Sequence, residues 1–302
     1  MKLFIVGNGF DLNFGLRTKL SDFGEYLRVN EQDIFYTLRG LHGLSGTPDD
    51  FSDLQQWNHL ETRMANFDES FIIDEAQYSF DRQEAYPPPS DNFWAYAADH
   101  FDDLVNPIIH ELPRLVREWA LNIDTSDASD ENIEAYERFG QRNQGAAFLT
   151  FNYTRVLQDV CDLQNVFHVH GEAEAGDVVI GHSAQFVRAA VKLGDINEIS
   201  ELYGGFETYN DHFRKRQDDL FNGVSEFLSN AMSHRRVDEV VACGHSIGDA
   251  DRGYFLSISH LVPNAIWTFT PFGGSGSQDH VNVAGLTSDT SFFPTVTAFD
   301  VL

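Results

Sequence analysis

The sequence predicts an α/β protein with a mainly parallel sheet flanked by helices, and three observations favour this fold class. The apolar run Lys2–Val6 passes directly into a glycine-rich turn and then into helical sequence. The order of strand, polar or glycine-rich loop and helix recurs in the second half of the chain. Between the first two predicted strands, about residues 20–143 show no convincing buried strand and are typical of a helical insertion. At 302 residues, the chain suits one Rossmann-like domain over residues 1–302 that carries this insertion.

The loop after the first strand has the pattern of a phosphate-binding turn. Glycine lets the backbone approach a ligand closely, and the N-terminus of the following helix supplies N–H donors and partial positive charge. The candidate cofactor-binding residues of this loop are Gly7, Asn8, Gly9, Phe10 and Asp11. Because the third glycine of the usual dinucleotide fingerprint is missing, a tight strand-to-helix turn without a ligand remains an alternative.

The predicted insertion is built from helices and loops. A first helix is expected over Leu16–Leu27, a loop over Gly40–Asp50 and an amphipathic helix over Asp50–Phe67. A proline-rich break at Tyr86–Asp91 precedes a long helix from about Asn92 to Leu121. We expect this block to cover the cofactor edge of the sheet.

Two acidic features lie in the same block. Glu61 follows Trp57 by four residues, which places its carboxylate close to the apolar face of the predicted helix. It is either a capping partner for a neighbouring loop, which we favour, or a site residue. The run Asp124–Glu131 is an acidic turn that we expect to be a solvated loop.

Further strands and helices are predicted after the insertion. The inner strands are expected at Ala146–Phe151, Asn165–His170, Asp238–Cys243 and Ala265–Thr270, with weaker candidates at Val178–Ser183 and Phe292–Val301. The helices are expected after Tyr153 through Val160, over Phe206–Met232 and from Asp249 to about Leu261. This alternation predicts parallel strands joined by crossover helices.

Four of the predicted strands end in small or polar residues. These ends are residues 7–11, 150–154, 168–171 and 244–249. In a parallel sheet the carboxyl ends of the strands lie at one edge, so we expect these loops to lie together there. The further candidate cofactor-binding residues are Thr150, Tyr153, Gly244, His245, Ser246 and Asp249. For the last loop the alternative is a simple helix N-cap, a role that suits Asp249.

Two side chains in these loops are candidates for catalysis. Asn152 could orient a ribose hydroxyl or a water through its amide, although an Asx turn that closes the strand is an equal alternative. His170 stands at a strand exit before Gly171 and can act as an acid or a base near neutral pH. His168 faces the same side of the strand and could instead be a buried, hydrogen-bonded histidine. A metal at this His-x-His pair is not expected, because no nearby aspartate completes a ligand set.

The composition excludes several classes of function. With 20 basic and 47 acidic residues the net charge is −27, which disfavours nonspecific nucleic-acid binding and anionic membranes. The same charge argues against a nuclease, since the chain also lacks a carboxylate metal cluster. The two cysteines, Cys161 and Cys243, cannot form a zinc knuckle or a disulfide framework, which fits a reducing compartment. We see no signal peptide and no membrane span, and we expect a cytoplasmic protein.

A set of motifs spread over nearly the whole chain carries a family resemblance. They are Leu3-Phe-Ile-Val-Gly-Asn-Gly-Phe-Asp-Leu12, Trp57-x-x-x-Glu61, Thr150-Phe-Asn-Tyr-Thr154, His168-Val-His-Gly171 and Gly244-His-Ser-Ile-Gly-Asp-Ala-Asp251. In combination and order they resemble the AbiH family of bacteriophage abortive-infection proteins. That family is itself similar to the sirtuin-like (SIR2) fold of NAD-consuming enzymes. The resemblance therefore implies a SIR2-like, Rossmann-like fold with NAD as its ligand.

The resemblance also implies roles for individual residues. Gly7–Asp11 matches the cofactor-binding glycine loop, and Gly244–Ser246 matches the later loop that holds the adenosine-side ribose. Asn152 matches the sirtuin asparagine near the nicotinamide ribose, and His170 matches the catalytic histidine. Asp11 could help to position the carboxamide or the ribose.

The chain departs from the sirtuin pattern in two respects. Sirtuins usually carry Gly-Ala-Gly followed by a serine in the first loop, where this chain has Asn8 and Asp11. No four-cysteine zinc module is present, which argues against protein deacylation.

Two hypotheses for function follow. The first is an antiphage effector that binds NAD as its substrate and hydrolyses the nicotinamide–ribose bond, through a transition state like an oxocarbenium ion. The second is a nucleotide sensor or regulatory subunit that binds NAD or a related nucleotide without turnover. The acidic surface leaves room for a homo-oligomer or for assembly with a basic partner, such as an ATPase.

Overall fold

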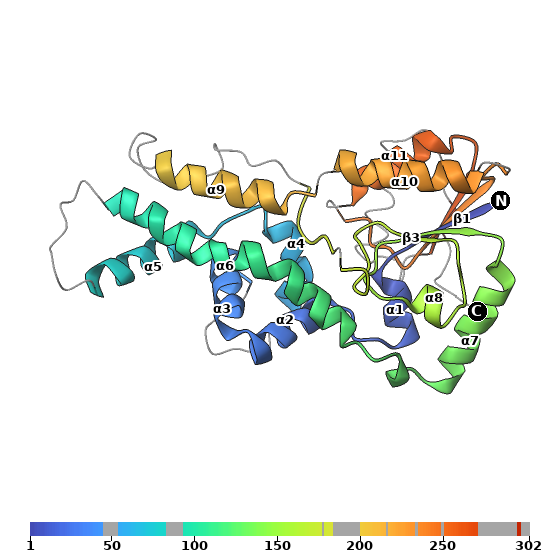
Figure 1. The fold of residues 1–302 in the computed structure, drawn as a ribbon, viewed down its shortest axis with the longest axis horizontal. Coiled ribbons are helices and arrows are strands. Elements are labelled where there is room, and N and C mark those ends of the chain that lie inside the picture. The colour runs from blue at the N-terminus through green and yellow to red at the C-terminus, as the bar shows by residue number, and fades with distance from the viewer. Residues whose placement is uncertain are drawn as a thin grey trace. The chain divides into compact units, whose positions relative to one another are not determined.

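The computed structural model divides the chain into two compact units (Figure 1). The sheet unit comprises residues 1–19, 117–179 and 216–302, and the helical unit comprises residues 20–116 and 180–215. The residues that the structure describes are 1–44, 54–82, 93–176, 178–183, 200–215, 217–232, 235–248, 251–270 and 295–296. The extent predicted for the insertion and the single-domain boundaries stay predictions.

The sheet unit contains a parallel sheet with β1 at its centre. Its strands are β1 (Lys2–Val6), β2 (Ala147–Thr150), β3 (Val166–His168), β4 (Glu239–Cys243), β5 (Ile266–Thr270) and β6 (Thr295–Val296). The spatial order is β3-β2-β1-β4-β5-β6, and every strand pair is parallel. This is the doubly wound order, in which the direction of winding reverses between β1 and β4. The predicted Rossmann-like α/β fold class is confirmed.

Helices cover both faces of this sheet (Figure 1). They are α1 (Asn8–Phe14), α7 (Asp130–Asn143), α8 (Val156–Asp159), α10 (Gln217–Met232) and α11 (Arg252–Leu261). Leu3 and Ile5 point to the face covered by α10 and α11, whereas Phe4 and Val6 point to the face covered by α1, α7 and α8. Because both faces are buried, the strand reads as a continuous apolar run rather than an alternating one.

The helical unit supplies a second core. Its elements are α2 (Leu20–Asn30), α3 (Gln32–Leu41), the 3-10 helix η1 (Leu54–His59), α4 (Leu60–Arg63), α5 (Glu69–Arg82), most of α6 (Phe93–Leu121) and α9 (Ser200–Phe213). Aromatic rings fill this core: Phe35 stacks on Trp57 at 5.0 Å between ring centroids, and Phe67 stacks on Phe206 at 4.6 Å. No strand occurs among the described residues between β1 and β2, so the helical character expected there is confirmed.

Three predictions of secondary structure were wrong. In its described part, the amphipathic helix expected over Asp50–Phe67 is the 3-10 helix η1 followed by the four-residue helix α4. Residues 178–183 form no strand of the sheet, and His182 makes only an isolated bridge to Arg214. The helix expected over Phe206–Met232 is two helices, α9 and α10, with a break near Lys215. The differences at 178–183 and 206–232 have one cause. The His182 N–H donates to the carbonyl of Phe213 at 3.0 Å, and the Lys215 N–H donates to that of His182 at 2.8 Å, so the two segments pair with each other.

Glu61 has a structural partner beside this pairing. Its carboxylate lies 2.9 Å from Nζ of Lys215, whose side chain is fully buried, and also accepts a hydrogen bond from the Gly181 N–H at 3.4 Å. A buried ammonium group needs such a counter-charge. These contacts support the structural role that we favoured for Glu61.

Among the described residues, no helix has the length and the uninterrupted apolar sequence that a membrane span requires.

Candidate functional site

The loops that follow β1, β2, β3 and β4 meet at the carboxyl edge of the sheet. The Gly9 N–H donates to the carbonyl of Gly244 at 2.7 Å, and the Val169 N–H donates to that of Thr150 at 2.8 Å. The Phe151 and His245 rings are 4.5 Å apart, which joins the β2 and β4 loops. Because the winding reverses between β1 and β4, this edge is where open α/β sheets bind ligands.

The two glycines at this edge allow the β1 and β4 loops to pack closely. A Cβ atom on Gly7 would lie 2.6 Å from Cα of His245. Gly244 has φ +60°, and a Cβ atom there would lie 2.5 Å from the backbone nitrogen of Phe10. Neither position accepts a larger residue without moving backbone. Close packing of protein against protein thus explains both glycines without a ligand.

Backbone N–H groups of the first loop are already hydrogen-bonded within the protein. Gly9 donates to Gly244, and the Phe10 N–H donates to the carbonyl of Gly7 at 3.0 Å. The Phe10 ring is fully buried against Tyr136, at 4.7 Å between centroids. Asn8 is exposed, and its side chain donates to the carbonyl of Thr18 at 2.8 Å. The loop therefore fits a pyrophosphate less well than its sequence suggests.

Asp11 is a buried carboxylate on the first turn of α1. It is 1% exposed and accepts hydrogen bonds from Nδ2 of Asn152 at 2.8 Å and from the hydroxyl of Thr154. Burial raises the pKa of Asp11 to about 6, against the opposing effect of the bonds from Thr154 and Asn152. These contacts tie the β1 loop to the β2 loop across 141 positions of sequence.

Asn152 is 7% exposed and is held by the site around it. Its Nδ2 donates to the carbonyl of Gly7 at 3.2 Å as well as to Asp11, and its backbone N–H donates to the hydroxyl of Thr150 at 3.2 Å. Both donors of the amide are therefore used, which leaves its oxygen as the atom that can face a hydroxyl or a water. Tyr153 next to it donates to the carbonyl of Val179 at 2.9 Å.

His170 is 4% exposed and stands beside a carboxylate. Its Nε2 lies 3.2 Å from Oδ1 of Asp251, and its ring meets Phe151 edge-on at 5.1 Å between centroids. Asp251 also lies 3.8 Å, through Oδ2, from Nε2 of His245. This carboxylate was not predicted from the sequence, although Asp251 ends the Gly244–Asp251 motif. The residue predicted in that segment was Asp249, which lies outside the described residues.

His168 has a separate, structural role. Its Nδ1 bonds to the carbonyl of Asn152 at 2.9 Å and its Nε2 bonds to Gln158 at 2.7 Å. Burial lowers its pKa. Both ring nitrogens are therefore engaged, and His168 fits the buried, hydrogen-bonded alternative.

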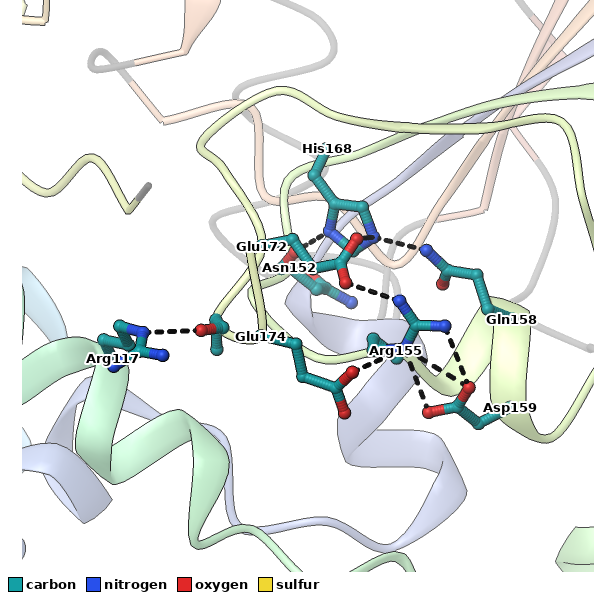
Figure 2. A network of polar contacts seen from close by, with 9 residues as sticks. Arg117, Asn152, Arg155, Gln158, Asp159, His168, Glu172 and Glu174 are labelled. Atoms are coloured by element: carbon teal, nitrogen blue, oxygen red, sulfur yellow. Dashed lines mark hydrogen bonds and ion pairs between the residues drawn. The ribbon is translucent and has the colours of Figure 1, made fainter. Parts of the chain in front are cut away.

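Figure 2 shows how the chain that follows His170 is anchored. The Arg155 guanidinium donates to Glu172 at 2.5 Å and also lies 3.4 Å from Glu174. Nε of Arg117 donates to the carbonyl of Ala173 at 2.8 Å. Residues 172–174 are thus held from α6 and from the start of α8, and this limits the freedom of the adjacent His170.

The last candidate loop is sharply bent. Ile247 has φ 51°, and its N–H donates to Nδ1 of His245 at 2.9 Å. This bond holds the buried His245 ring, while Ser246 between them is exposed. Among the described residues, no group of three or more His, Cys, Asp or Glu side chains is arranged to hold a metal ion.

The assembled site comprises the buried Asn152 amide, Asp11 carboxylate and imidazoles of His170 and His245, together with the partly exposed Asp251 carboxylate. Such a set can accept a proton, orient a water or hydroxyl, and stabilise positive charge.

Comparison with known proteins gives one family. The family model described as "Bacteriophage abortive infection AbiH" matches residues 3–270, which includes every described residue of this site. A comparison with curated proteins finds no match.

Proposed function

Because the chain belongs to the bacteriophage abortive infection family AbiH, we propose that it acts in abortive infection as an enzyme that binds NAD and hydrolyses the nicotinamide–ribose bond. Membership of the family indicates a role in antiphage abortive infection. The NAD chemistry, and with it a SIR2-like relation, is our proposal. Loss of NAD would stop the metabolism on which phage replication depends.

The observation that carries the proposal is the environment of His170. A histidine that is 4% exposed and lies 3.2 Å from a carboxylate, at the same sheet edge as Asn152, is arranged as a general base. A structural histidine would use both ring nitrogens for protein contacts, as His168 does.

The proposed reaction balances with the groups present. A water oxygen bonds to the anomeric carbon of the nicotinamide ribose while the bond from that carbon to the pyridinium nitrogen breaks. The electron pair stays on the nitrogen, so nicotinamide leaves as a neutral molecule and needs no general acid. His170 takes the proton that the water loses. The oxygen of Asn152 orients the water or a ribose hydroxyl, and Asp11 holds Asn152 in place.

The glycine loop is the proposed location of the pyrophosphate, with a condition. The N–H groups of Gly9 and Phe10 would first have to exchange their present partners, Gly244 and Gly7, for phosphate oxygens. The support for NAD therefore comes from Asn152 and His170, and from the position of the site where the direction of winding reverses between β1 and β4.

The test is release of free nicotinamide from NAD by the purified protein, followed by chromatography. We expect release by the wild type and none above background by His170→Ala or His170→Gln. The matched control is His260→Ala, which removes an exposed histidine of α11 in the same unit and should keep wild-type release. All variants should melt within about 5 °C of the wild type, which corresponds to roughly 1 kcal/mol.

Asn152→Ala is a less direct test. It should also abolish release, but it removes two hydrogen bonds of a buried group and leaves Asp11 short of a donor. A lower melting temperature is therefore expected, and the His170 variants decide the question. Release by a folded His170→Ala protein would refute the assignment of the base.

The alternative function has its own outcome in this experiment. A wild-type protein that releases no nicotinamide, but melts at a higher temperature when NAD is added, is a nucleotide sensor or regulatory subunit. If the wild type neither releases nicotinamide nor shows a thermal shift with NAD, NAD is refuted as the ligand.

A further inference from the structure

We propose that Asp251 is a positioning residue that fixes the tautomer of His170, holding the ring proton on Nε2 and leaving Nδ1 as the atom that accepts the proton in catalysis. This inference rests on the proposed function for its catalytic meaning. The tautomer itself can be measured without NAD.

The backbone sets the tautomer of the neighbouring His245. Its Nδ1 accepts a hydrogen bond from the Ile247 N–H at 2.9 Å, so that nitrogen carries no proton. In the neutral ring the proton is then on Nε2. This atom lies 3.8 Å from Oδ2 of Asp251.

The second oxygen of the same carboxylate faces His170. Oδ1 of Asp251 lies 3.2 Å from Nε2 of His170. An ionised carboxylate can accept hydrogen bonds but cannot donate them. The two atoms are at ion-pair distance without hydrogen-bond geometry. The tautomer with the proton on Nε2 is still favoured, because the other tautomer would bring a nitrogen lone pair close to negative charge. The described residues give Nδ1 of His170 no hydrogen-bond partner, so this nitrogen remains to accept a proton.

The arrangement follows the logic by which a buried aspartate orients a catalytic histidine. The carboxylate sets the tautomer and stabilises the imidazolium that forms when the base takes up a proton. Here one carboxylate lies between two imidazoles, from the β3 and β4 loops, and it belongs to the N-cap residue of α11. A residue at the N-terminus of α11 thus positions His170, which follows β3.

Asp251→Asn tests this directly, since it replaces one acceptor oxygen with an NH2 donor. His245 must keep its proton on Nε2 because the Ile247 N–H occupies Nδ1. The amide oxygen will therefore face His245, and the NH2 group will face His170. His170 must then accept at Nε2, and its proton moves to Nδ1.

The measurement is the tautomer of each ring by two-bond ¹H–¹⁵N correlation spectra of histidine-labelled protein at neutral pH. The His170 and His245 signals are assigned among the 12 histidines with His170→Gln and His245→Gln. We expect the wild type to show His170 protonated on Nε2, and Asp251→Asn to show it protonated on Nδ1. Asp251→Glu, which keeps the carboxylate, should keep the wild-type tautomer.

Glu172→Gln is the matched control. Its carboxylate lies 3.6 Å from Nε2 of His168, the other histidine of the His-x-His pair, and its loss should leave the His170 tautomer unchanged. A wild-type His170 protonated on Nδ1, or a His170 whose tautomer is the same in folded Asp251→Asn, would overturn the proposal. If Asp251→Asn does not fold, the wild-type spectrum still decides.

Catalysis gives an independent readout. Asp251→Asn should lower kcat for nicotinamide release at least about 100-fold with KM within about 3-fold, since it misdirects the base without removing a substrate contact. Asp251→Glu should recover part of kcat. An equal loss in both variants would contradict a positioning role. If the wild type releases no nicotinamide, the proposed function is refuted but the tautomer proposal is not, because the spectra test the tautomer separately.

Discussion

Asp11 shows how a single residue links the site to folding. It is fully buried, and its pKa is raised from 3.8 to about 6, chiefly because burial disfavours the charged form. The folded protein therefore binds this proton more tightly than the unfolded chain does. The contribution of the protonated Asp11 carboxyl to the free energy of unfolding is fully present below about pH 3.8. This contribution is lost as the pH rises through about 6.

The first prediction concerns Asp11→Asn. The amide is close to isosteric and neutral at every pH, so it lacks the cost of a buried charge. Relative to the wild type, we expect the variant to gain roughly 1 kcal/mol in the free energy of unfolding between about pH 5 and about pH 7.5. Urea unfolding at the two pH values measures the difference.

The control is Asp33→Asn, which removes an exposed carboxylate from α3. It should leave the relative stability nearly the same at both pH values. If Asp11→Asn instead loses stability as the pH rises, the Asp11 carboxylate is stabilised by its bonds to Thr154 and Asn152 more than burial destabilises it.

At this scale the sequence predicted where polar side chains would gather, but not which of them would pair. Asn152 and His170 could be placed at strand ends because strand and loop residues differ in type. The bond from Asn152 to Asp11 depends on the register between β1 and β2, which local pattern does not contain. Asp251 was missed for the same reason, since its partners belong to other loops.

Among the elements, the strands were easier to predict than the helices. β1, β4 and β5 are short apolar runs bounded by glycine or polar residues, and the structure places them within a residue of the expected bounds. The break between α9 and α10 was missed because it depends on the pairing of residues 182 and 215. Helical periodicity continues through that break, so it gives no local indication.

A pair of helical glycines gives a prediction at this scale. A Cβ atom on Gly140 of α7 would lie 1.8 Å from the carbonyl oxygen of Cys161, whereas one on Gly204 of α9 would meet nothing within 4 Å. Gly140→Ala should therefore lower the free energy of unfolding by roughly 2 kcal/mol or more, because backbone must move. Gly204→Ala should raise it by roughly 0.5–1 kcal/mol through helix propensity alone.

The two variants make the same chemical change, so each is the control for the other in thermal or urea unfolding. Equal effects of one sign would contradict the packing of α7 against the Cys161 carbonyl. Loss of stability in Gly204→Ala would show that this surface of α9 is covered in solution.

For the whole molecule, charge is the dominant property. The chain carries 47 acidic against 20 basic residues, and several of its described ion pairs are exposed, such as Arg138 with Glu134. Exposed pairs contribute little to stability, whereas an excess of 27 negative charges repels itself throughout the folded surface. The balance should therefore favour unfolding at low ionic strength.

We accordingly expect the melting temperature to rise when NaCl is increased from about 20 mM to about 200 mM, because the screening length falls to below about 10 Å and the repulsion is damped. A glucose solution of equal osmolality controls for effects other than screening and should give a smaller rise. The competing term is the loss of attraction in pairs such as Arg155 with Glu172, which salt also screens. A melting temperature that falls with NaCl would mean that these local attractions outweigh the repulsion, so that the acidic residues are placed to stabilise the fold.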